Sequence, residues 1–201
     1  MVTSLDIQQH GLAMPILDEL AEEIAVTMRG EVRRNEPMAR HTTFGVGGPA
    51  DLYLMPQDDD DLTRALSLLY RMGIPVKVFG NGSNVLVADR GIRGAVIRLT
   101  PRFAQIKREG NTVIAGAGAK LAQVVQFAAK EALSGLESTM GIPGTVGGAL
   151  VMNAGTDIGC ISDLVESAGF FTLSGERLDK TGDQLAYGYR CSALQDCQLV
   201  V

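Results

Sequence analysis

The sequence predicts a protein in which helices and short strands are mixed along the chain, with glycine-rich loops between them. Apolar residues at helical spacing, as in residues 14–29 and 121–133, alternate with short apolar runs such as Pro75–Phe79. Glycine accounts for 24 of the 201 residues, and the excess is clustered. With 46% hydrophobic residues the chain can bury a core, and its length indicates one or two domains.

The first half of the chain predicts two helices and several short strands. Acidic residues opposite an apolar stripe predict a surface helix over residues 14–29. Residues 31–40 are polar and expected to be extended. A second helix is predicted to begin at Asp58–Asp61 and to end at Gly73. Strands are predicted at residues 51–55, 75–79, 85–87 and 95–99.

The acidic run Asp58–Asp61 has two interpretations. Clustered carboxylates suggest a divalent metal site, but four consecutive residues point around a helix and not to one side of it. Acidic residues in a first turn complement the positive end of the helix dipole. A solvated helix start is therefore favoured.

The second half predicts a hairpin, a helix and a further strand. Residues 103–109 and 112–115 form the hairpin across Gly110-Asn111. The apolar spacing of residues 121–133 indicates a helix that stops at Gly135. Leu164–Leu173 alternates as a strand and leads into a turn at residues 174–176.

Charge and composition exclude several classes of protein. The net charge is −5 and no basic block is present, which argues against nucleic acid or an anionic membrane as partner. No run of about 18 apolar residues indicates a membrane span. The start of the chain lacks the order of a signal peptide. Cys160, Cys191 and Cys197 lack metal-ligand spacing, so a reduced cytosolic protein is expected.

Three glycine-rich segments stand out, at His41–Ala50, Gly80–Asn84 and Gly141–Gly155. The last has no charged residue, and Pro143 stiffens it. Glycine lets a backbone pass close to a flat or phosphorylated group, since it has no Cβ and accepts positive φ. A glycine loop between two strands, as predicted around Gly80–Asn84, also lets backbone N–H groups converge on phosphate oxygens. The alternative is a set of tight turns between core elements.

Four segments together resemble one family, the UDP-N-acetylenolpyruvoylglucosamine reductases. They are His41–Ala50, Gly80–Leu99, Gly135–Gly155 and the sequence Tyr189-Arg190-x-Ser192. The Gly80–Asn84 loop alone is shared with many flavoproteins, whereas its combination with Gly-Ile-Pro-Gly-Thr-Val-Gly-Gly and Asn153-Ala154-Gly155 is specific. The resemblance covers roughly residues 30–201.

The resemblance implies an α+β fold, a two-lobed FAD-binding domain of the vanillyl-alcohol-oxidase/PCMH type. We expect an N-terminal helical extension over residues 1–30, one FAD-binding lobe over 31–100 and a second, incomplete lobe over 101–201. The family continues into a substrate-binding domain that carries a proton-donating serine and a glutamate. That domain is expected to be missing here, so this portion of the protein is expected to be inactive alone.

The resemblance also implies a site. Non-covalent FAD and NADPH would be the cofactors, and a UDP-sugar the substrate. Tyr189 and Arg190 would bind that substrate, and Arg190 would be catalytic, because a guanidinium can stabilise a carboxylate and a developing enolate. Taken alone, Arg190 reads as a surface arginine. The residues expected to hold FAD are Gly80, Asn81, Gly82, Ser83, Asn84, Gly141, Ile142, Pro143, Gly144, Thr145, Gly147 and Gly148.

The family reaction takes a hydride from NADPH through flavin N5 to the enolpyruvyl group of UDP-N-acetylglucosamine enolpyruvate, in cytoplasmic peptidoglycan precursor synthesis. A monomer is the default expectation. Thr156–Cys160 departs from the family pattern, which leaves that loop's contacts open. Two alternatives remain, a non-catalytic FAD-binding module and another oxidoreductase of the same flavin fold. Such oxidases often tether flavin through histidine, but His10 and His41 lie outside Gly80–Asn84 and Gly141–Gly148.

Overall fold

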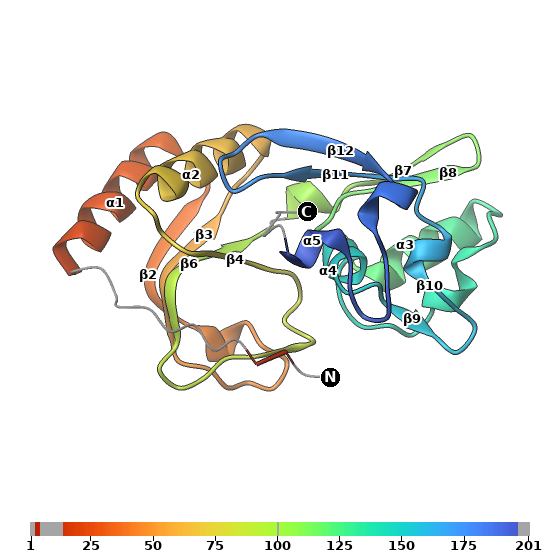
Figure 1. Ribbon diagram of the computed structural model, residues 1–201, viewed down its shortest axis with the longest axis horizontal. Coiled ribbons are helices and arrows are strands. Elements are labelled where there is room, and N and C mark those ends of the chain that lie inside the picture. The colour runs from red at the N-terminus through yellow and green to blue at the C-terminus, as the bar shows by residue number, and fades with distance from the viewer. Residues whose placement is uncertain (1–2, 5–13, 100, 197–201) are drawn as a thin grey trace. The chain divides into compact units, whose positions relative to one another are not determined.

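The computed structural model describes residues 3–4, 14–99 and 101–196, and the chain divides into two compact units (Figure 1). One unit holds Met1–Thr100 with the short segment Leu173–Gly175, and the other holds Pro101–Thr172 with Glu176–Val201. Cys197 and His10 lie outside the described residues.

The first unit is built on a mixed four-stranded sheet. Its strands are β2 (Glu31–Pro37), β3 (Pro49–Met55), β6 (Ile92–Arg98) and β4 (Val76–Phe79), in the order β2-β3-β6-β4. β2 runs antiparallel to β3, whereas β3 and β4 both run parallel to β6. β1 (Thr3–Ser4) pairs with β5 (Val85–Leu86) in parallel.

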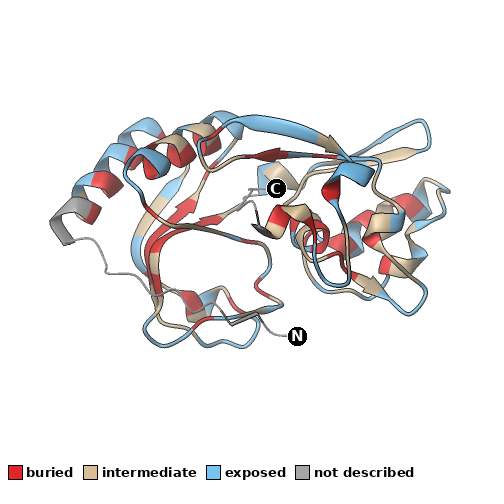
Figure 2. Ribbon diagram, in the orientation of Figure 1, coloured by how far each residue is buried: buried red, intermediate tan, exposed pale blue. Residues whose placement is uncertain are grey.

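Two helices pack side by side on this sheet, α1 (Met14–Thr27) and α2 (Asp59–Arg71) (Figure 1). The buried residues of both helices lie on the side that faces the sheet (Figure 2). The sheet is buried on its other face too. Tyr53 of β3 packs in an apolar cluster with Met38, Phe79 and Val96, while its neighbours Leu52 and Leu54, which point the opposite way, are also fully buried.

The second unit is made of hairpins and short helices. The hairpins are β7–β8 (Ile106–Glu109, Thr112–Ala115), β9–β10 (Gly155–Thr156, Gly159–Cys160) and β11–β12 (Ser167–Phe171, Arg177–Thr181). The helices are α3 (Leu121–Lys130), α4 (Val146–Val151) and α5 (Ala193–Asp196). Their shared core centres on Leu121, Leu150, Ile161, Phe170 and Leu185.

The helices α2 and α3 close in the same way at their C-terminal ends, but around different kinds of residue. After α2, Gly73 adopts φ +66°, and the N–H groups of Gly73 and Ile74 bond back to the carbonyls of Tyr70 and Leu69. This closure confirms the predicted stop at Gly73. After α3, the same pair of bonds is made around Ala132, at φ 54°. The prediction that this helix runs to Gly135 was therefore wrong.

The stretch Gly141–Gly155, predicted as a bare loop, contains the helix α4. Thr145 caps it, because its hydroxyl oxygen accepts from the N–H of Gly148. Ala149 and Leu150 on α4 enter the core of the second unit. The prediction of a loop missed α4 because the glycines lower the helix propensity of the segment, whereas the helix is stabilised by packing against the core.

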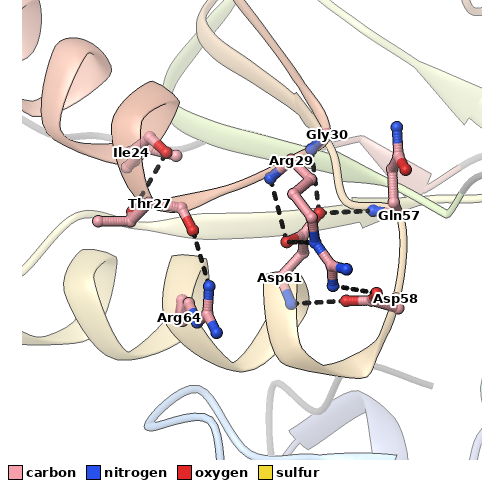
Figure 3. Close-up of polar contacts among 8 residues, drawn as sticks. All are labelled: Ile24, Thr27, Arg29, Gly30, Gln57, Asp58, Asp61 and Arg64. Atoms are coloured by element: carbon pink, nitrogen blue, oxygen red, sulfur yellow. Dashed lines mark hydrogen bonds and ion pairs between the residues drawn. The ribbon is translucent and has the colours of Figure 1, made fainter.

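The acidic start of α2 is only partly solvated, which corrects the prediction for Asp58–Asp61. Asp58 caps the helix by accepting from the N–H of Asp61, as Figure 3 shows. The Asp61 side chain is completely buried and accepts from the N–H groups of Arg29, Gly30 and Gln57 at 3.0–3.1 Å. The guanidinium of Arg29 pairs with both carboxylates. Asp61 thus ties the exit of α1 to the entry of α2.

Candidate functional site

Three loops of the first unit are joined through their backbones. The N–H of Thr43 donates to the carbonyl of Gly82 at 3.0 Å. The N–H of Gly48 donates to the carbonyl of Ala88 at 3.0 Å, and the N–H of Gly91 donates to the same carbonyl at 2.8 Å. The segments 41–50, 80–84 and 88–91 therefore form one layer of loops beside the sheet.

Glycine is required in this layer because the backbones approach so closely. A Cβ on Gly82, at φ +64°, would lie 2.0 Å from the carbonyl oxygen of His41. A Cβ on Gly48 would lie 1.9 Å from the carbonyl oxygen of Asp89, and one on Gly91 would lie 1.9 Å from that of Pro49. The predicted cofactor loop Gly80–Asn84 is thus held against its neighbour by glycine contacts within the protein.

A polar cluster lies at the start of the 41–50 loop. The imidazole of His41 stacks on the ring of Tyr53 with centroids 4.3 Å apart, and its Nε2 lies 2.9 Å from Oε1 of Glu36. The contact with His41 holds the pKa of Glu36 below its usual range, with Arg33 adding to the effect against the opposing effect of burial. Burial raises the pKa of Tyr53, although a hydrogen bond from Arg98 opposes it.

The segment Gly91–Gly94, also part of the family resemblance, is anchored to the sheet. Arg93 Nη1 lies 2.8 Å from Oδ1 of Asp51, and Arg93 Nη2 donates to the carbonyl of Pro49 at 3.1 Å. The second carboxylate oxygen of Asp51 accepts from the N–H of Gly94 at 2.9 Å. These contacts anchor the Gly91–Gly94 segment to β3.

In the second unit, the predicted loop Gly141–Gly148 is joined to the segment before α3. The N–H of Val146 donates to the carbonyl of Ala119, and the N–H of Gly147 donates to the carbonyl of Ala117, both at 2.9 Å. In the opposite direction, the N–H of Leu121 donates to the carbonyl of Gly144. Gly141 differs from the rest of the segment. It adopts φ +82°, and nothing lies within 4 Å of the position a Cβ would take. Its backbone therefore faces open space.

The Tyr189–Arg190 pair projects from a tight turn. The N–H of Gly188 bonds to the carbonyl of Cys191, and Arg190 adopts φ 58°. Both side chains are exposed, Tyr189 at 93%, and the guanidinium carbon of Arg190 lies 6.0 Å from the centroid of the Tyr189 ring. Both side chains are accessible to a ligand.

Two residues that the sequence reasoning did not assign hold this turn. Asn153, at φ 43° and buried, donates through Nδ2 to the carbonyl of Gly188 at 2.9 Å and accepts at Oδ1 from the N–H of Ser162. The hydroxyl of Ser192 donates to the carbonyl of Val151 at 2.9 Å. Asn153 and Ser192 thus fix the Tyr189–Arg190 turn against the end of α4. The signal for Asn153 was present, since it is the one polar amide in the glycine-rich stretch.

Tyr187 packs against the same core as Ile142 and Val146. Its hydroxyl oxygen is buried, and burial raises the pKa of Tyr187 to about 12. That hydroxyl has no hydrogen-bond partner among the residues that the structure describes. A buried donor beside the glycine segment is a feature that a bound ligand could satisfy.

The predicted residues fall into two groups, each described within its own unit. Gly80, Asn81, Gly82, Ser83 and Asn84 form one loop in the first unit, following the carboxyl end of β4. Gly141–Gly148 and Tyr189–Arg190 belong to the second unit, where α4 and Asn153 link them. No group of three His, Cys, Asp or Glu side chains within the described residues could hold a metal ion.

The comparisons with known proteins define the class. Residues 50–180 match the model of the FAD-binding domain, and the chain belongs to that family. The relatives found are UDP-N-acetylenolpyruvoylglucosamine reductases. That of Desulforamulus reducens is 43% identical and that of Geobacter metallireducens 47% identical, each over 185 residues that make up 92% of this chain and 61% of the relative. The chain is thus a homologue of these reductases and spans about three fifths of their length.

Solved structures support the same assignment. The crystal structure of UDP-N-acetylenolpyruvylglucosamine reductase from Thermus caldophilus matches with a TM-score of 0.72 at 38% identity, over 87% of this chain and 60% of that one. The structure of 6-hydroxy-D-nicotine oxidase from Arthrobacter nicotinovorans, at 19% identity and a TM-score of 0.59, shares the fold over 79% of this chain and 37% of that one. The predicted FAD-binding domain of the vanillyl-alcohol-oxidase/PCMH type is confirmed.

Among helices in the described part of the chain, none has the length and apolar character that crossing a membrane requires. Cys160 and Cys191 are free thiols.

Proposed function

We propose that this chain is the FAD-holding part of a UDP-N-acetylenolpyruvoylglucosamine reductase. The observation that carries the proposal is the agreement between the FAD-binding domain match over residues 50–180 and relatives of that name at 43–47% identity over 92% of the chain. The reaction would reduce UDP-N-acetylglucosamine enolpyruvate with NADPH, in the cytoplasm, as a step toward peptidoglycan.

The residues present fit FAD. The loop Gly80–Asn84 contains amide and hydroxyl side chains and no carboxylate, so nothing in it would repel a pyrophosphate. Gly141 has open space where a side chain would stand, and the buried hydroxyl of Tyr187 lacks a partner among the described residues. We assign Gly80–Asn84 to the pyrophosphate. Gly141, Ile142, Pro143, Gly144, Thr145, Gly147 and Gly148 would lie along the rest of the cofactor.

FAD supplies a carrier that accepts a hydride from NADPH and passes it to the substrate. The protein's own contribution is orientation and charge. Arg190 would pair with the substrate carboxylate and stabilise the negative charge that develops on it, because a guanidinium stays charged and donates in a fork. Tyr189 would bind the substrate next to it. Asn153 and Ser192, which hold the turn, would set the direction of Arg190.

The contacts of His41 support non-covalent attachment. His41 is the described histidine, and both of its ring nitrogens already contact protein side chains. The test is to purify the chain with bound or added FAD, denature it and pass it through a filter. We expect all flavin in the filtrate. Flavin retained with the polypeptide would contradict non-covalent binding, and a chain that binds no FAD after reconstitution would contradict the cofactor assignment.

The second candidate is an FAD-binding module without turnover. It is favoured by the fact that the matching family model over residues 50–180 is an FAD-binding domain, which by itself specifies no reaction. NADPH oxidation in air distinguishes the two readings. A module without turnover leaves NADPH unchanged, whereas a reductase portion oxidises NADPH and passes the electrons to oxygen.

A further inference from the structure

The turn that carries Tyr189 and Arg190 has a strained backbone. Two hydrogen bonds between Gly188 and Cys191 close it, so Tyr189 and Arg190 are its two central residues. Arg190 adopts φ 58°. A tight turn with positive φ at the second central residue, as in type II, favours glycine or asparagine at that place. An arginine there carries backbone strain that a glycine would avoid.

Strained residues are concentrated around this turn. Among the described residues, five that are not glycine adopt positive φ, and three of them, Asn153, Ala186 and Arg190, belong to this turn or bond to it. Ala186, at φ 45°, directs the chain from the 3₁₀-helix Gly182–Leu185 into the turn. Strained backbone persists where surrounding contacts maintain it, and it gathers at sites that hold a ligand. Side chains that maintain this turn are therefore candidates for positioning its tip.

Two side-chain amides hold the backbone on either side of the tip. Nδ2 of the buried Asn153 donates to the carbonyl of Gly188 at 2.9 Å. Nε2 of Gln195 donates to the carbonyl of Arg190 at 3.1 Å and lies 3.1 Å from Sδ of Met152. Gln195 belongs to α5, which packs against α4 (Figure 1). The amides thus hold the peptide carbonyls before and after the two central residues.

The side chains at the tip are open to solvent although the backbone beneath them is held. Tyr189 is 93% exposed, and the guanidinium carbon of Arg190 lies 6.0 Å from the centroid of its ring. Arg190 is exposed as well. An exposed guanidinium on a fixed backbone can meet a carboxylate without first ordering the main chain, which lowers the entropy cost of binding.

We propose that Asn153 and Gln195 are positioning residues for Arg190, and that they hold the turn in its left-handed conformation so that the guanidinium is presented to the substrate carboxylate before binding. The inference rests on the proposed function, which assigns that carboxylate to Arg190. A glycine at position 190 would form the turn without strain but would carry no guanidinium. The two amides maintain the strained conformation that keeps a cation at the tip.

The first measurement needs no ligand. In the ¹⁵N-labelled full chain, we expect the backbone amide of Arg190 to have an order parameter of about 0.85, the value of rigid backbone. In Gln195→Ala it should fall below about 0.6, because the Arg190 carbonyl loses its partner and the strained turn relaxes. Gln184→Ala is the matched control, since that side chain bonds to the N–H of Thr181 outside the turn. An Arg190 amide that stays equally rigid in Gln195→Ala would overturn the proposal.

The second measurement compares two ligands by calorimetric titration, UDP-N-acetylmuramic acid and UDP-N-acetylglucosamine, of which only the first has a carboxylate. We expect the wild-type chain to bind the first about tenfold more tightly, as one hydrogen bond between charged groups contributes. In Gln195→Ala and Asn153→Gly this preference should fall to about threefold or less, with affinity for UDP-N-acetylglucosamine unchanged. Glycine at position 153 removes the amide and still accepts φ 43°. An undiminished preference in both variants would contradict the positioning role.

The third measurement separates stability from binding. Ala186→Gly and Ala132→Gly each relieve left-handed strain, so each should raise the midpoint of thermal unfolding by about 2–4 °C. Only Ala186→Gly should also lower the preference for the carboxylate ligand, because Ala132 lies at the end of α3. An equal preference in the two variants would refute the role of strain. A wild type without any preference, whose Arg190 is nevertheless rigid and loosens in Gln195→Ala, would instead place the failure in the proposed function.

Discussion

Asp61 brings a carboxylate into the interior of the first unit and meets donors there from three backbone positions (Figure 3). Burial acts to raise the pKa of Asp61, but the N–H groups of Arg29, Gln57 and Gly30 outweigh it and the pKa is lowered. Those N–H groups have the carboxylate as their partner, so its loss would leave buried donors unpaired.

Asp61→Asn should therefore destabilise the protein by about 2–3 kcal/mol, because an amide supplies one acceptor oxygen where two are used and turns an N–H toward a donor. The measurement is urea unfolding near neutral pH. Asp60→Asn is the control, since that exposed residue belongs to the same acidic run. Equal loss in both variants would indicate a general charge effect.

The lowered pKa of Asp61 also predicts how the free energy of unfolding depends on pH. A carboxylate whose folded pKa is depressed stabilises the fold above its unfolded pKa of about 3.9, and that contribution is lost as pH falls through the lower folded value. The free energy of unfolding should thus fall more steeply on acidification below about pH 4 in wild type than in Asp61→Asn. Parallel curves would contradict the role assigned to Asp61.

Gly82 and Gly141 both adopt positive φ, at 64° and 82°, but only Gly82 is crowded. Gly141→Ala should cost roughly 1 kcal/mol from backbone strain alone. Gly82→Ala should cost at least about twice that, because its Cβ would force the His41 carbonyl away. Thermal unfolding of the two variants tests the difference, and an equal loss would mean that the crowding relaxes freely.

At the scale of elements, the sequence predicted most helices and strands but not every boundary. Gly73 was readable as a helix stop because glycine accepts φ +66° without strain. Ala132 was not, since alanine at φ 54° is disfavoured and only the surrounding packing maintains it. The helix α4 escaped notice for a related reason, because its glycines weaken local propensity while Ala149 and Leu150 are buried in the core.

The end of α3 gives a direct test of this account. Ala132→Gly should stabilise the protein by about 1 kcal/mol, because glycine relieves the left-handed strain while the closing bonds to Ala128 and Ala129 remain. Ala129→Gly, at an exposed position within α3, should instead destabilise it by about 0.5–1 kcal/mol. Differential scanning calorimetry of the two variants gives the sign of each change in stability. The same sign for both would refute the αL argument.

For the whole molecule, the resemblance predicted the FAD-binding family correctly, whereas the residues that organise its loops came only from the structure. The glycine motifs are visible in the sequence because their spacing is local. The partnership of Glu36, His41, Tyr53 and Arg98 joins three strands and a loop, and nothing in the sequence indicates their register. Long-range pairings of this kind depend on topology that pattern reading does not supply.

Catalytic turnover is a property of the whole molecule. The 201 residues alone should not form UDP-N-acetylmuramic acid at an enzyme-like rate, because the serine acid and the glutamate implied by the resemblance match no residue here. A missing general acid costs about 10²–10⁴ in rate. The assay measures NADPH oxidation with and without the enolpyruvyl substrate, followed by product analysis. Substrate-dependent product at normal rates would show that the assigned residues suffice.

The loop layer of the first unit is held by main-chain amides and carbonyls. This determines which of its positions can accept substitutions. Thr43 and Ala88 contribute only an N–H and a carbonyl, and their side chains are exposed, so position 43 tolerates almost any residue except proline and position 88 is similarly free. Gly48, Gly82 and Gly91 tolerate none. In a population of variants selected for flavin retention, diversity would persist at positions 43 and 88, whose main-chain bonds do not depend on the side chain, and would vanish at the three glycines, where a side chain has no room.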